Sequence, residues 1–276
     1  MLDIINKKEL GFMEILSIAM HLFIKNIKPI AIVVCVLFLP ISIVTTMLVE
    51  RVHSGSVILL NMMQSGMTDE NLLAYENEYI RLLINTTLSF AVTIFLEPIG
   101  VIAIAKIGKS YLCGKAMNVK DAIGEGMNCL FGVILTGILF SVCVIFGTFL
   151  FIIPGLYLSI VWGFYIYVVG LNGVKGWNAV KYSTQLTKNR FWKTLAFFWG
   201  LAFIVFGWSW TIGVLFSLGY DHSIVSILST MISYFFACFA YFAITVLFMN
   251  REAILLGVQQ GLNEEAMLRS DAESKE

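Results

Sequence analysis

Residues 126–174 read GMNCLFGVILTGILFSVCVIFGTFLFIIPGLYLSIVWGFYIYVVGLNGV, a run of 49 residues without Asp, Glu, Lys, Arg or His. A helix needs about 20 predominantly apolar residues to cross the hydrocarbon core of a bilayer. The run is long enough for two such helices, and Pro154-Gly155 between them is a dipeptide suited to a turn. Because a helix satisfies its own backbone polar groups where water is absent, we expect a membrane-crossing helical hairpin that turns at Pro154 and Gly155.

The whole chain shares the character of this run. Of its 276 residues, 59% are hydrophobic and 13% are charged, whereas soluble domains carry roughly 25% charged residues. Eighteen basic and eighteen acidic residues balance, so the composition gives no support for nucleic-acid binding, which usually needs a basic excess. We therefore predict an all-α integral membrane protein whose 276 residues form one membrane domain.

Six segments are long and apolar enough to be predicted as transmembrane helices. Only the second contains a charged residue, Glu97. The predicted spans cover approximately residues 29–49, 82–105, 128–153, 156–174, 194–219 and 224–250.

Short amphipathic stretches precede the first, third and fifth spans. In residues 12–25 the apolar side chains follow helical spacing, while Glu14, His21 and Lys25 fall on the opposite stripe. Residues 118–127 and 176–188 occupy the equivalent places. We expect three short amphipathic helices in the cytoplasmic interface. Two explanations stay open: three repeated helix-plus-hairpin units, or the general frequency of interfacial helices before spans.

Basic residues predict the orientation of these spans, because they concentrate in cytoplasmic loops. With both termini in the cytoplasm, sixteen Lys and Arg residues lie inside, and only Arg51 and Arg81 lie outside. We therefore expect a multi-pass protein of the cell (cytoplasmic) membrane with cytoplasmic N- and C-termini.

Three segments resemble a known protein family. Residues 147–155, GTFLFIIPG, are similar to the G-x-[LF]-L-x-I-I-P-G signature of bacterial membrane proteins named after the membrane domain of some glycerophosphoryl diester phosphodiesterases. Residues 179–188 resemble that family's A-x-x-x-S-x-x-L-x-K segment, and the loop at 111–123 also matches. The resemblance implies a polytopic protein of a bacterial cytoplasmic membrane, and it supplies no activity.

The sequence offers no group of residues typical of catalysis. His21, His53 and His222 are dispersed, and the five cysteines show no paired spacing. No H-E-x-x-H, G-x-S-x-G or P-loop motif is present. We expect no enzymatic activity, no metal and no cofactor.

Glu97 requires an explanation, because a charge at membrane depth is costly unless it has a partner or is protonated. Counting residues from the span ends places Thr136, Tyr165 and Tyr241 at a similar depth, and each has a hydroxyl that can bond to a carboxyl group. One interpretation is a structural tie between helices near Pro98. The other is a carboxylate that handles protons or cations.

A second candidate site is the basic loop between the fourth and fifth spans. Its five cations are flanked by Trp177 and Trp192 at the predicted inner membrane edge. Such a loop could bind anionic lipids, or its charges could serve only to set the orientation of the chain. The five are Lys175, Lys181, Lys188, Arg190 and Lys193.

These observations favour a non-catalytic accessory or scaffold module in bacterial envelope or membrane homeostasis. Its expected partners are the lipid bilayer and, beyond it, anionic lipids or another membrane protein. The alternative is a small transporter or lipid-handling protein with a cavity around Glu97. A transporter predicts a polar cavity at membrane depth, whereas an accessory module predicts a packed core and an informative surface.

Overall fold

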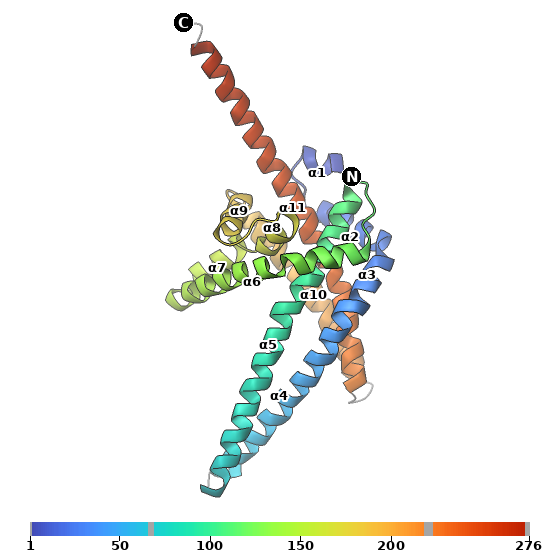
Figure 1. Cartoon of the computed structure of the whole chain (residues 1–276), viewed down its shortest axis with the longest axis vertical. Helices are drawn as coiled ribbons and strands as arrows, with labels where there is room; N and C mark the ends of the chain where they lie inside the picture. Colours follow the sequence, from blue (N-terminus) through green and yellow to red (C-terminus); the bar gives the residue numbers. More distant parts are fainter. Residues whose placement is uncertain (1, 66–68, 218–222, 274–276) are drawn as a thin grey trace.

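The computed structural model describes residues 2–65, 69–217 and 223–273, and every regular element in them is helical (Figure 1). The all-α class is thereby confirmed. In chain order the elements are α1 (Leu2–Lys7), α2 (Phe12–Lys25), α3 (Ile27–Val33), η1 (Val34–Phe38), α4 (Leu39–Ser65), α5 (Asp69–Leu112), α6 (Val119–Leu150), α7 (Ile152–Val161), α8 (Tyr165–Asn172), α9 (Trp177–Thr187), α10 (Phe191–Ser217) and α11 (Ser223–Glu273).

Within the described residues, six helical segments are long and apolar enough to cross a membrane. Each overlaps one of the six predicted spans, although residues 218–219 of the fifth prediction lie outside the described residues. The observed segments are 27–65, 72–112, 119–150, 152–172, 191–215 and 224–257.

Three helical hairpins diverge from one region where they all meet, which we call the hub. The pair α4–α5 forms one arm, α10–α11 forms the second, and α6–α7 extends across the direction of α5 as the third (Figure 1). The hub holds fully buried side chains, among them Phe164, directly before α8, and Phe242 and Phe248 of α11. Van der Waals packing of such large side chains stabilises contacts between apolar helices, also where lipid replaces water.

The turn between α6 and α7 lies at Phe151, where the backbone is extended and its N–H bonds to the carbonyl of Gly147 at 3.1 Å. Our prediction of the turn at Pro154 and Gly155 is wrong, because both residues belong to the first turns of α7. Proline is tolerated there, since the first helical N–H groups have no intrahelical acceptor. A Cβ atom at Gly155 would lie 1.9 Å from the Thr148 hydroxyl, so glycine permits close approach of the two helices.

One further segment differs from the sequence-based expectation. Residues 118–127 do not form a separate interfacial helix, because α6 runs without a break from Val119, capped by the Asn118 side chain. Between the first two predicted spans, α4 continues to Ser65, and α5 starts at Asp69 and has 44 residues. At 1.5 Å per residue α5 is about 66 Å long, far more than a hydrocarbon core of about 30 Å.

Helix α2 has a helical partner. Phe12 at its start lies edge-on to Phe197 of α10, with 5.5 Å between ring centroids. Phe23 near its end contacts Phe235 and Phe239 of α11. The apolar stripe that we interpreted as a membrane-surface signal is therefore buried, in large part, against α11 and α10.

Candidate functional site

Glu97 links two of the spans. The Tyr241 hydroxyl of α11 donates a hydrogen bond to Oε1 of Glu97 on α5, at 3.1 Å. Both side chains are partly buried, and Pro98 follows within α5. A hydroxyl can bond to a carboxyl group in either protonation state, so this contact holds α5 and α11 together without requiring a buried charge.

The other two residues predicted near Glu97 lie elsewhere. Thr136 accepts a hydrogen bond from the Gly176 N–H at 2.8 Å and donates to the Gly132 carbonyl at 2.7 Å. Tyr165 stacks on Phe140, with 5.0 Å between ring centroids. Equal counting from the span ends failed because α6 crosses the direction of α5 instead of running beside it (Figure 1).

Helix α9 closes a break in the fourth span. Between α7 and α8, Val161 and Phe164 flank residues that leave the helix. Buried backbone groups that lose their helical partners there need other partners. The Ser183 hydroxyl donates to the Val161 carbonyl at 2.9 Å and accepts from the Phe164 N–H at 3.3 Å. Ser183 is fully buried. Ser183 therefore lies inside the fold, although Lys181 and Lys188 on either side of it in sequence are exposed.

The five basic residues of the predicted lipid-facing loop divide into two groups. Lys175, Lys181 and Lys188 are exposed. Arg190 and Lys193, in contrast, form ion pairs with a single carboxylate, Glu9, at 3.6 and 3.1 Å. These two residues are therefore paired with Glu9, unlike the other three, although the Lys193 side chain itself is exposed.

Arg251 completes that site. Its Nη1 donates to Oε1 of Glu9 at 2.7 Å, and only 3% of the residue is exposed. Its Nε is also buried and has no hydrogen-bond partner in the described part of the chain. We call Glu9, Arg190, Lys193 and Arg251 the Arg251 cluster. It contains three cations and one carboxylate.

The cations of the cluster determine the acidity of Glu9. Partial burial alone would raise the pKa of this carboxyl group, because burial disfavours the charged form. Hydrogen bonds from Arg251 and Lys193, together with the charges of Arg251 and Arg190, outweigh burial and lower the pKa below its ordinary value. Glu9 is therefore ionised at neutral pH.

Asn250, the neighbour of Arg251, holds the N-terminal segment against α11. Its side-chain oxygen accepts from the Leu10 N–H at 3.1 Å. Its amide nitrogen donates to the carbonyls of Ile5 and Lys8, at 2.6 and 2.8 Å. Asn250 is fully buried, so three backbone groups that are remote in sequence have their partners on one side chain.

Glu252 continues this pattern. Its Oε1 accepts hydrogen bonds from Asn172 at the end of α8 and from Tyr182 of α9, at 2.5 and 2.9 Å. Burial, followed by the bond to Glu252 and its charge, raises the pKa of Tyr182, which stays a hydrogen-bond donor. Three successive residues of α11 thus tie the N-terminal segment, α8, α9 and the start of α10 to one helix.

The triplet Asn250, Arg251 and Glu252 was not predicted as a site from the sequence. Polar residues that follow a long uncharged run normally mark the end of a transmembrane helix. A signal was present: residues 253–256 are Ala-Ile-Leu-Leu, so the apolar pattern resumes after the triplet. A polar triplet inside a continuing apolar helix indicates buried partners rather than a membrane border.

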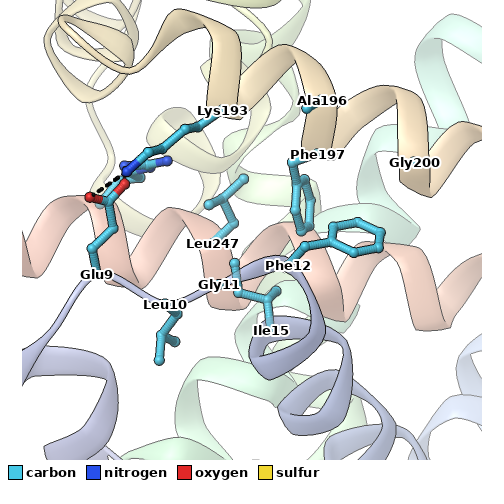
Figure 2. Close-up of a pocket in the computed structure, with 11 residues that line it drawn as sticks. Glu9, Leu10, Gly11, Phe12, Ile15, Lys193, Ala196, Phe197, Gly200 and Leu247 are labelled. Carbon is cyan, nitrogen blue, oxygen red and sulfur yellow. Dashed lines mark hydrogen bonds and ion pairs between the residues drawn. The ribbon is translucent and has the colours of Figure 1, made fainter.

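A cavity of about 510 Å³ lies beside the Arg251 cluster, between α2, α10 and α11 (Figure 2).

Within the described residues, no group of three or more His, Cys, Asp or Glu side chains could hold a metal ion. No family model, curated protein or solved structure matches this chain.

Proposed function

We propose that this chain is a non-catalytic accessory or scaffold module of a bacterial cytoplasmic membrane, with both termini in the cytoplasm. The observation that carries the proposal is that three apolar hairpins diverge from one hub (Figure 1). Hydrogen bonds and ion pairs of Asn250, Arg251 and Glu252 hold the segments of this hub together. At the turn of the α6–α7 arm, Phe149, Ile152 and Ile153 are 88%, 76% and 80% exposed. Arms of this kind offer long apolar surfaces to lipid and to the helices of other membrane proteins.

The bacterial membrane and the orientation rest on the sequence. The segment at 147–155 resembles a bacterial membrane-protein family, and the bias of basic residues favours cytoplasmic termini. Lys175, Lys181 and Lys188 are exposed and could contact anionic lipid headgroups at the cytoplasmic surface.

Transport around Glu97 lacks a comparable observation. The carboxyl group already has a hydrogen-bond partner in Tyr241. Glu97 does not line the cavity beside the Arg251 cluster. It also does not line a second, largely apolar cavity between α2, α10 and α11, which is described below. A structural tie therefore explains Glu97 without a transport pathway.

Photocrosslinking in native membranes tests the scaffold role. A benzophenone amino acid would replace an exposed phenylalanine on each arm: Phe90 of α5, Phe149 of α6 and Phe206 of α10. We expect at least one arm to give a discrete protein adduct. Phe140, which stacks on Tyr165 inside the fold, is the matched control and should give no intermolecular adduct.

Adducts with lipid alone at all three arms would contradict the scaffold role. A second measurement addresses transport directly. If Glu97→Gln folds normally but abolishes a proton or cation flux that the wild-type protein supports in liposomes, the carboxylate is functional and the transporter alternative is correct.

A further inference from the structure

The cavity beside the Arg251 cluster has two chemically different ends. Glu9 and Lys193 lie together at one end, while Phe12, Ile15 and Phe197 lie away from them (Figure 2). Its volume of about 510 Å³ falls within the range of roughly 300–1,000 Å³ typical of small-molecule sites. The lining residues are Glu9, Leu10, Gly11, Phe12, Ile15, Lys193, Ala196, Phe197, Gly200, Leu247 and Arg251.

The charged end is short of negative charge. Among the residues that the structure describes, Arg190, Lys193 and Arg251 share the single carboxylate of Glu9. Arg251 is almost fully buried, and its buried Nε has no hydrogen-bond partner in the parts of the chain described. A guanidinium group has five N–H donors and satisfies them best with carboxylate or phosphate oxygens. A second anion at this end would supply the missing negative charge.

A separate cavity lies further along the same helices, beyond the Phe12 ring, which packs against Gly200 of α10. This second, largely apolar cavity of about 560 Å³ is lined by Met20 and Phe23 of α2 and by the next turns of α10, from Phe203 to Thr211. One leaflet corresponds to about 15 Å, half of a hydrocarbon core of about 30 Å. The ten residues from Lys193 to Phe203 also span about 15 Å. A chain that starts at the charged end would therefore reach the second cavity within one leaflet.

We propose that the cavity beside the Arg251 cluster binds one membrane lipid with an anionic phosphate headgroup. Arg251 and Lys193 bind the phosphate oxygens, and one acyl chain lies along α2 and α10 toward the second cavity. The occupant is a lipid and not free phosphate, because the rest of the cavity is apolar and would gain nothing from an ion alone. The assignment does not depend on the scaffold role.

Zwitterionic lipids fit this site less well. Their headgroups bring a cation of their own toward three cationic side chains, whereas an anionic headgroup brings only the missing negative charge. In the predicted topology α10 starts at the cytoplasmic surface, so the bound lipid belongs to the inner leaflet, where anionic lipids attract basic groups.

Native mass spectrometry of the full-length protein in detergent tests the assignment, with dioleoyl phosphatidylglycerol and dioleoyl phosphatidylcholine as probes. We expect one tightly held phosphatidylglycerol per protein and clearly weaker retention of phosphatidylcholine. Ala196→Phe fills the cavity and should lower phosphatidylglycerol binding at least ten-fold. Ala202→Phe places the same bulk on α10 in a different cavity, beside Phe198 and Trp199, and should leave binding unchanged.

Lys193→Gln probes the headgroup contact without a risk to folding, because 68% of the Lys193 side chain is exposed. One basic group near an anionic headgroup is worth about 1 kcal/mol, which corresponds to a loss of about five-fold in binding. Inorganic phosphate at millimolar concentration should not displace the lipid, because it lacks the acyl chain.

Three results would overturn the proposal. The first is equal retention of phosphatidylglycerol and phosphatidylcholine. The second is the same effect of Ala196→Phe and Ala202→Phe in folded protein. The third is displacement of the bound lipid by inorganic phosphate, which would identify an anion site without a chain site. If Ala196→Phe does not fold, unchanged binding in Lys193→Gln alone would refute the headgroup assignment.

Discussion

Glu97 and the Arg251 cluster both place ionisable groups among apolar helices, but they are held in opposite ways. Glu97 has a neutral partner, the Tyr241 hydroxyl, on one neighbouring helix. Arg251 pairs with Glu9, which also binds Arg190 and Lys193 from the start of α10. The first site is a single contact between two helices, and the second joins three segments that are distant in sequence.

This difference determines how each site should respond to mutation. A neutral hydrogen bond can be lost with the cost of one unsatisfied group. Removing one member of a buried ion pair leaves an uncompensated charge, which costs more. Within the cluster the cost also depends on which member remains, because the Glu9 side chain is 30% exposed and that of Arg251 only 4%.

Glu9→Leu should have the largest effect. It leaves the buried Arg251 guanidinium without its carboxylate and should lower the free energy of unfolding by about 3 kcal/mol. Arg251→Met is the informative counterpart, because Glu9 keeps Arg190 and Lys193 and remains near solvent. We expect a loss of only about 1 kcal/mol there.

Unfolding by SDS in detergent micelles would measure both variants. A larger loss for Arg251→Met than for Glu9→Leu would mean that the packing of Arg251, and not its charge pairing, stabilises the hub.

Asn250→Leu should come next. It removes the partner of three backbone groups, and each costs about 1–3 kcal/mol if it stays buried without a partner. Because residues 5–10 can be released to water instead, we expect the free energy of unfolding to fall by about 2 kcal/mol in total. Hydrogen exchange should therefore become faster at residues 5–10. Asn172→Leu, which removes one side-chain bond to Glu252, is the control and should leave exchange at residues 5–10 unchanged. Unchanged protection in Asn250→Leu would show that this side chain does not hold the segment.

Glu97 should be more tolerant. Glu97→Gln keeps the shape and a hydrogen-bonding group, so we expect a loss below about 0.5 kcal/mol. Glu97→Leu strands the Tyr241 hydroxyl and should cost about 1–2 kcal/mol. The same SDS titration would measure both. Equal losses of stability in the two variants would show that the hydrogen bond from Tyr241 does not stabilise the fold.

The pH dependence that Glu9 confers tests the same ion pairs. Its ordinary pKa is 4.5, and the folded state lowers this pKa. Its contribution to stability is therefore fully present above about pH 4.5 and is lost as the pH falls through the lowered folded pKa. The difference between wild type and Glu9→Gln should shrink in that acidic range. A difference that grows on acidification would have the wrong sign for this account.

The sequence predicted what depends on long local patterns. Six apolar segments and the single intramembrane carboxylate were visible because each is a contiguous feature or an exception within one. The partner Tyr241 was among three candidates, but depth counting could not separate it from Thr136 and Tyr165, because counting assumes parallel helices.

Features built from distant segments were not predictable in the same way. The Arg251 cluster combines Glu9, two residues at the start of α10 and one residue of α11, and nothing in the sequence spacing brings them together. The turn at Phe151 was missed for a different reason: Pro154 and Gly155 have turn propensity, yet proline is equally suited to the first turn of a helix and glycine to close helix contact. Packing, not propensity, decided between them.

In the proposed orientation the Arg251 cluster and Lys188 lie on the cytoplasmic side, and side-specific cysteine labelling tests this most directly. In a background without the five native cysteines, Ser65→Cys at the end of α4 and Lys188→Cys after α9 would be treated with a membrane-impermeant thiol reagent. We predict labelling of Ser65→Cys in intact cells and of Lys188→Cys only after permeabilisation. Labelling of Lys188→Cys in intact cells would contradict the topology and, with it, the inner-leaflet position of the Arg251 cluster.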